Sequence, residues 1–96
     1  MDETALFKDK ACNNIGILYN KQHKYNTSIL YFDKAVALNP NYALAYINRA
    51  TTRYQLKDIN GACLDLQKAI ALGLEDVNND YENYCNSANN SKNHFN

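Results

Sequence analysis

Catalysis and metal binding both require combinations of residue types that this sequence does not bring together. It has no glycine-rich phosphate loop, no nucleophile elbow and no Ser/His/Asp set at a usable spacing. The two histidines, His23 and His94, lie far apart, and no two cysteines are spaced as CxxC. We therefore expect no metal, no cofactor and no catalytic residue, and we predict that the protein is not an enzyme.

The three cysteines, Cys12, Cys63 and Cys85, are an odd number without close spacing. This usage fits a reducing compartment better than a disulfide framework. We expect Cys12 to be a buried apolar thiol. Cys63 and Cys85 could approach each other if a C-terminal helix folds back on the preceding one. Free thiols are expected there, with a disulfide as the alternative if the protein is exported.

The composition limits the kinds of partner that the protein could have. The 96 residues suffice for one small domain, in which ten basic side chains balance ten acidic ones and no basic cluster stands out. We therefore expect no nucleic-acid partner. The first residues are acidic, no signal-peptide pattern follows, and no apolar run reaches membrane-spanning length. A cytoplasmic protein is expected, with export after signal removal as the alternative.

The sequence repeats itself after 34 residues. A fixed period of this length is typical of stacked helical units, each of which needs a neighbour to bury its apolar face. The identical pairs under this shift are Ala11/Ala45, Asn14/Asn48, Asn26/Asn60, Leu30/Leu64, Lys34/Lys68, Ala35/Ala69, Ala37/Ala71 and Leu38/Leu72.

Apolar residues at helical spacing predict five helices. Pro40 should end the second helix, because the residue before proline is pushed out of the helical region. Asp58 should cap the fourth helix, and Gly73 should end it in a left-handed conformation. The predicted helices are residues 4–21, with Asp2 or Thr4 as cap, 26–38, 42–56, 59–72 and 75–85.

Residue size indicates where the helices cross. Gly16 and Ser28 are small at the expected closest approach of the first two helices, and Phe32 is large enough to fill the space beside them. The corresponding residues of the second unit are Ala50, Ala62 and Leu66.

The period and this pattern of small and large residues resemble the tetratricopeptide repeat, a helix-turn-helix unit. The resemblance implies an all-α helix-turn-helix repeat solenoid, similar to short bacterial proteins of that family. It divides a single domain, residues 1–86, into repeats at 9–42 and 43–76 and a capping helix at 75–86, followed by a flexible tail at 87–96. The matching residues of the first repeat are Cys12 in place of Trp, Ile15, Gly16, Tyr19, Ser28, Phe32, Ala35 and Pro40.

The resemblance also implies a function, because the family binds peptides or partner helices in a concave groove lined by the first helix of each repeat. Asn14 and Asn48 occupy the same position in both repeats, and a primary amide can both donate to and accept from a peptide backbone. The groove residues implied here are Asn13, Asn14, Ile17, Asn20, Lys21, Ile47, Asn48, Thr51, Tyr54 and Gln55.

Structural roles remain open for several of these residues. The two asparagines could instead bond locally or face water, and Ile17 and Ile47 could belong to the core. A family subset clamps a terminal carboxylate with basic residues, and Asn13 and Ile17 stand at two of those positions, so we expect no such clamp. The resemblance implies that Arg49 and Asp65 form a structural pair.

A different class of function also fits. Two repeats are fewer than the three usually needed for stability. The alternative is therefore a structural subunit that self-associates through its stacking ends without a peptide ligand. The expected partner is a protein or peptide in the first case and a second copy of the chain in the alternative.

Overall fold

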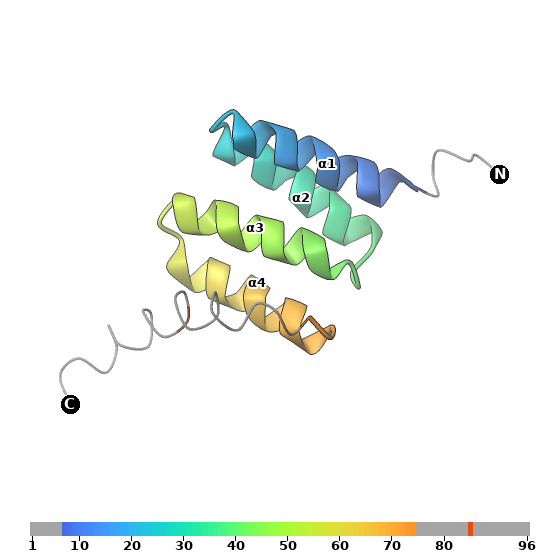
Figure 1. The fold of residues 1–96 in the computed structure, drawn as a ribbon, viewed down its shortest axis with the longest axis vertical. Coiled ribbons are helices and arrows are strands. Elements are labelled where there is room, and N and C mark those ends of the chain that lie inside the picture. The colour runs from blue at the N-terminus through green and yellow to red at the C-terminus, as the bar shows by residue number, and fades with distance from the viewer. Residues whose placement is uncertain (1–6, 75–84, 86–96) are drawn as a thin grey trace.

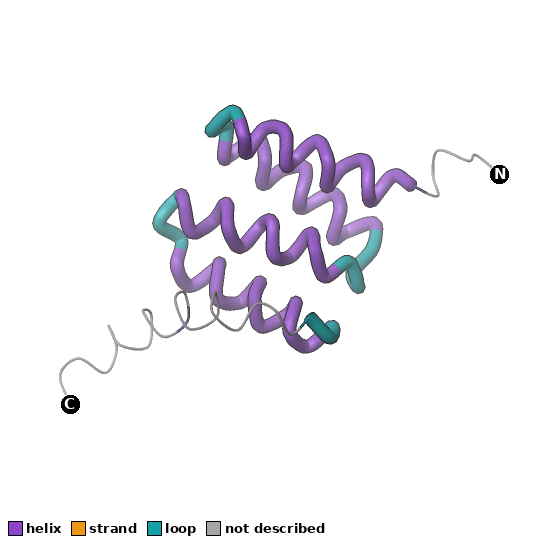
Figure 2. Tube along the Cα trace, viewed as in Figure 1, coloured by secondary structure: helices purple, strands orange, loops and turns teal. Residues whose placement is uncertain are grey.

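The computed structural model describes residues 7–74 and residue 85. This part contains four helices, which form two antiparallel hairpins, α1 with α2 and α3 with α4 (Figure 1). Helix α3 also lies against α2 and, over a smaller area, against α1. Short loops join the helices at alternating ends (Figure 2). The predicted all-α helical repeat is confirmed, and its helices are α1 (Lys8–Lys21), α2 (Tyr25–Leu38), α3 (Ala43–Gln55) and α4 (Ile59–Ala71).

The start of α1 differs from the prediction. The helix begins at Lys8 rather than Thr4, and the expected caps lie outside the described residues. In its first turn, Asp9 accepts a hydrogen bond from the side-chain amide of Asn39 at 2.9 Å, which joins the start of α1 to the end of α2. This hydrogen bond lowers the pKa of Asp9 below its ordinary value. The predicted capping helix and tail also lie outside the described part, apart from Cys85.

The turns follow the predicted helix ends and repeat with the sequence. His23 and Lys57, one period apart, have positive φ values of 61° and 68°, and Gly73 has a φ of 104°. A left-handed residue after a helix directs the following N–H groups back to the last carbonyls. The Asp58 carboxylate accepts a hydrogen bond from the Gly61 N–H at 3.0 Å, which confirms the predicted cap of α4.

The first hairpin crosses where the small residues predicted it. A Cβ atom on Gly16 would lie 2.5 Å from Cε1 of Phe32, a distance that forces one of the two groups to move. The Ser28 hydroxyl donates a hydrogen bond of 2.7 Å to the Gly16 carbonyl oxygen, so this buried polar group is satisfied. In the second hairpin Ala50, Ala62 and Leu66 form the equivalent cluster, and all three are fully buried.

The two hairpins bury a second cluster between them. Cys12, Ala35 and Ala45 form its centre, and Val36 and Tyr42 pack against it. Cys12 is 7% exposed, which confirms that it is a buried thiol. Small side chains at this contact allow α3 to approach the first hairpin closely. Apolar packing between repeats, as the period predicts, therefore joins them into one body.

The predicted pair of Arg49 and Asp65 is present and belongs to a larger network. Arg49 contacts Asp65 and Asp33 at 2.8 Å each, and Arg53 contacts Asp65 at 2.9 Å. Burial acts to lower the pKa of Arg49, but the hydrogen bonds and charges of the two aspartates outweigh it and raise that pKa. Asp65 is only 3% exposed, so its carboxylate is buried within this network.

The expectation of free thiols at Cys63 and Cys85 was also wrong. The two residues form a disulfide that links α4 to the C-terminal part of the chain, with their Cα atoms 4.9 Å apart. Cys85 is 1% exposed, whereas Cys12 remains a free thiol. A separation of 22 residues closes a loop of moderate length, and such a crosslink removes entropy from the unfolded chain.

The crossing of α1 and α2 can be tested by transferring the pairing of the second repeat to the first. Gly16→Ala alone should raise stability by about 1 kcal/mol through helix propensity and lower it by about 1–3 kcal/mol through overpacking against Phe32. In a Phe32→Leu background a leucine replaces the ring, as Leu66 does opposite Ala50 in the second repeat. Gly16→Ala should therefore be more favourable by about 1 kcal/mol or more in that background, measured by urea unfolding of the four proteins of the cycle. The same effect in both backgrounds would contradict the contact.

The disulfide should make stability sensitive to reductant. Closing a loop of this size is worth about 3 kcal/mol in the chain-entropy description, so dithiothreitol should lower the free energy of unfolding by up to that amount. Cys63→Ser should unfold like the reduced wild type and show no further response to dithiothreitol. Cys12→Ser is the matched control and should keep the response. Identical melting of the wild type with and without reductant would contradict the prediction.

Candidate peptide-binding face

Polar side chains, rather than apolar ones, join the first helices of the two repeats on one face. The Asn48 amide donates to Oδ1 of Asn13 at 3.0 Å, and the Asn13 amide donates to the Tyr42 hydroxyl at 3.4 Å. Further along, the Asn20 amide donates to the Thr52 hydroxyl oxygen at 2.8 Å. We call these contacts the polar bridges. They fix α1 relative to α3 and thereby form the base of the predicted binding face.

Asn13 and Asn20, both predicted to line the groove, use their side-chain amides in the polar bridges. Asn13 is 3% exposed, and both ends of its amide are engaged by neighbouring side chains. Asn20 is half-buried and bonds to a fully buried threonine. Both side chains join α1 to α3, so a ligand on this face would meet their neighbours rather than these amides.

The repeat-equivalent residues Asn14 and Asn48 have unlike surroundings. Asn14 is exposed on α1, where its amide faces solvent. Asn48 is half-buried and uses one amide hydrogen to satisfy Asn13. Truncating Asn48 would therefore remove a donor from the buried side chain of Asn13. Asn14 keeps the predicted freedom to bond to a partner.

The other predicted residues differ in exposure. On α1, Ile17 is half-buried and Lys21 exposed, and on α3 Gln55 is exposed. Ile47 packs against the core cluster of the second hairpin, which favours its structural role. The remaining two are Thr51, whose hydroxyl donates to the Ile47 carbonyl oxygen, and Tyr54, which is 37% exposed.

Two residues of the polar bridges were missed from the sequence, Tyr42 and Thr52. Thr52 is fully buried, and its hydroxyl also donates to the Asn48 carbonyl oxygen one turn earlier. The sequence feature that could have indicated them is a hydroxyl-bearing residue on the helix face toward the neighbouring repeat, where it can bond to an asparagine. Using that signal requires knowing which helix faces come together, and residue types alone do not reveal this.

The face offers non-covalent recognition: amide and hydroxyl groups, one cation at Lys21, and partly buried aliphatic surface. Within residues 7–74 and at residue 85, no group of His, Cys, Asp and Glu is arranged to hold a metal ion. No helix in that same part is long and apolar enough to cross a bilayer.

The stacked hairpins and their 34-residue period define a helical repeat protein. The family model described as "Tetratricopeptide repeat" matches residues 9–42, which hold α1, α2 and the loop to α3. The chain is 51% identical over 45 residues to RNA polymerase II-associated protein 3 of Xenopus tropicalis. That alignment covers 47% of this chain and 6% of the frog protein. Residues 9–42 thus match a tetratricopeptide repeat, which agrees with the paired helices of the fold.

The matched repeat type has a general function. Tetratricopeptide repeats mediate protein–protein interactions, and they are not themselves catalytic modules. The chain spans only a small part of the length of the frog relative.

The unequal surroundings of Asn14 and Asn48 predict unequal effects on stability. Asn48→Ala removes the donor to the buried Asn13 oxygen and should lower the free energy of unfolding by about 1–3 kcal/mol. Asn14→Ala changes an exposed residue of the same type at the same repeat position and should stay within about 0.5 kcal/mol of wild type. Chemical unfolding of both variants tests this, and equal stabilities would show that the Asn13–Asn48 bridge contributes nothing.

Proposed function

We propose that this chain binds an extended peptide or a helix of a partner protein along the α1–α3 face, through Asn14, Ile17, Lys21, Thr51 and Gln55. The observation that supports this proposal best is the set of polar bridges beneath the face. Because partly buried hydrogen bonds hold α1 and α3 together, the side chains beside them are attached to a fixed pair of helices. A preorganised surface loses less conformational entropy when a partner binds.

The exposed groups suit a polypeptide main chain. The amides of Asn14 and Gln55 can each pair with a peptide N–H and a carbonyl oxygen. Ile17 offers half-buried aliphatic surface, and the Lys21 ammonium can pair with a partner carboxylate or carbonyl oxygen. These groups would contact the main chain and the apolar surface of the partner, and they do not select one particular side chain.

The proposal is tested with peptides selected from a displayed random library on the purified protein. The double variant Asn14→Ala/Lys21→Ala should weaken binding of a selected peptide by one to two factors of ten, since it removes two polar contacts. The matched control is Asn60→Ala/Lys68→Ala, which changes the same residue types on exposed positions of α4. Affinity is measured by titration calorimetry, after unfolding curves show that both variants are folded.

Equal affinity for wild type and both double variants would overturn the proposal. Failure to select any peptide, together with a concentration-dependent dimer in sedimentation, would favour the self-associating subunit instead. For the compartment, the disulfide is relevant, because such bonds persist in oxidising surroundings. It supports keeping the exported alternative beside the cytoplasmic one.

A further inference from the structure

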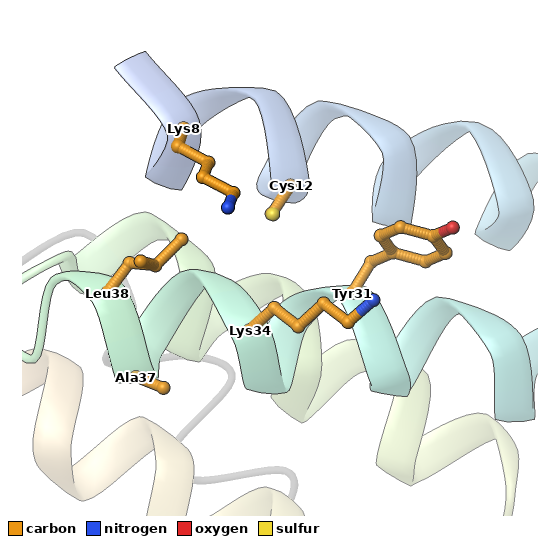
Figure 3. A pocket seen from close by; sticks show the side chains of 6 residues that line it. All are labelled: Lys8, Cys12, Tyr31, Lys34, Ala37 and Leu38. Carbon is orange, nitrogen blue, oxygen red and sulfur yellow. The ribbon is translucent and has the colours of Figure 1, made fainter. Parts of the chain in front are cut away.

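A groove of about 480 Å³ opens between α1 and α2, apart from the proposed peptide-binding face. Figure 3 shows the Cys12 thiol pointing into it from α1, with Tyr31 and Leu38 on α2 opposite. Lys8, Lys34 and Ala37 complete its lining. We call it the Cys12 groove. None of its six residues belongs to the set predicted to bind a peptide.

The second repeat has an aromatic residue at the position equivalent to Cys12. The residue equivalent to Cys12 is Tyr46, whose side chain is 9% exposed. Its hydroxyl donates to the Pro40 carbonyl oxygen at 3.0 Å, and the Arg49 guanidinium lies 5.5 Å from the ring centre. An aromatic ring is thus packed at this position in one repeat. In the other, a thiol stands in its place and the groove remains open.

The charges around the groove are positive and lack acidic partners in the described part of the chain. Lys8 forms no ion pair there, and the Lys34 ammonium lies 4.8 Å from the ring centre of Tyr31. The adjacent carboxylate of Asp9 is engaged by Asn39. Two ammonium groups, one from each helix, therefore border an apolar opening in which half-exposed Leu38 remains uncovered.

We propose that the Cys12 groove binds an aromatic side chain of a partner polypeptide, with a neighbouring carboxylate of that partner paired to Lys8 and Lys34. The ring would supply at Cys12 the aromatic group that Tyr46 supplies at the equivalent position of the second repeat, and it would cover Leu38. Burying a ring supplies most of the attraction, since aromatic side chains remove a large apolar area from water. The ammonium groups add orientation and select acidic sequences over basic ones.

The probe is a capped synthetic pentapeptide, Gly-Asp-Tyr-Glu-Gly, added to the isotope-labelled full chain and followed by amide chemical shifts. A single ring with two exposed ion pairs should bind weakly, with a Kd on the order of 1 mM. The shifts should concentrate on the groove residues of α1 and α2. Alkylation of the Cys12 thiol by iodoacetamide should slow as the peptide saturates the groove. Peptides with Ala for Tyr, or with Lys for both acidic residues, should bind at least tenfold more weakly.

Variants separate the groove from other surfaces. Cys12→Tyr supplies the ring found in the second repeat and should abolish binding, whereas Cys12→Ala leaves the groove open and should keep it. Leu38→Asp changes a residue that is 50% exposed, so it tests the same site without altering the core. It should weaken binding at least tenfold, and Lys8→Gln/Lys34→Gln should weaken it by roughly three- to tenfold.

The proposal is overturned if Cys12→Tyr and Leu38→Asp, both shown to be folded by circular dichroism, bind the probe as wild type does. It is also overturned if the peptide shifts Asn14 and Lys21 instead, which would place the ligand on the α1–α3 face. A dimer that Cys12→Tyr disrupts, without peptide binding by the wild type, would assign the groove to a second copy of the chain.

Discussion

The close approach of α1 and α2 at Gly16 controls how the first repeat is built. No side chain can be present there without meeting the ring of Phe32, and the Ser28 hydroxyl bonds to the Gly16 carbonyl oxygen in the same space. At the equivalent crossing of the second repeat, Ala50 lies opposite Leu66, which is smaller than Phe32. The helix pair therefore conserves the combined volume at its crossing while its individual residues differ, as expected where interiors are close-packed. Because this contact sets the geometry of the first hairpin, it also determines how far Cys12 on α1 stands from α2.

Packing between the repeats combines two kinds of contact. Small apolar residues such as Ala35 and Ala45 bring the hairpins together, and the polar bridges of Asn13 and Asn20 then fix α1 relative to α3. Every buried side-chain nitrogen and oxygen of the described residues has a hydrogen-bond partner. A satisfied buried amide costs little, but it strongly disfavours any sliding of one helix past the other, because sliding would leave it unpaired. The polar bridges thus contribute to the uniqueness of the arrangement more than to its total stability.

The sequence predicted the features that depend on local pattern. Helix ends, the cap at Asp58 and the Gly16 crossing follow from propensity, proline and residue size, which act within one hairpin. It did not predict the Cys63–Cys85 disulfide or the burial of Asn13. Both depend on which faces meet after folding, and neither a cysteine nor an asparagine shows by its type whether a partner will lie opposite. The contact between α1 and α3 agrees with the predicted stacking of the first helices, but the division of their residues into buried and exposed ones required the structure.

Equivalent positions in the two repeats have been put to different use. Asn48 donates a hydrogen bond to Asn13, whereas Asn14 is exposed. Tyr46 is a buried aromatic residue, whereas the equivalent Cys12 lines an open groove. In both comparisons the residue of the second repeat makes contacts within the domain, and the first repeat has an exposed amide or an open groove at the equivalent position. Repeats with the same helix arrangement can differ in role in this way. The side chains of one repeat pack within the domain, and those of its neighbour remain available to a partner. On that argument we expect a partner to contact the first repeat through the exposed residues of α1 and through the Cys12 groove, while α3 adds Thr51 and Gln55.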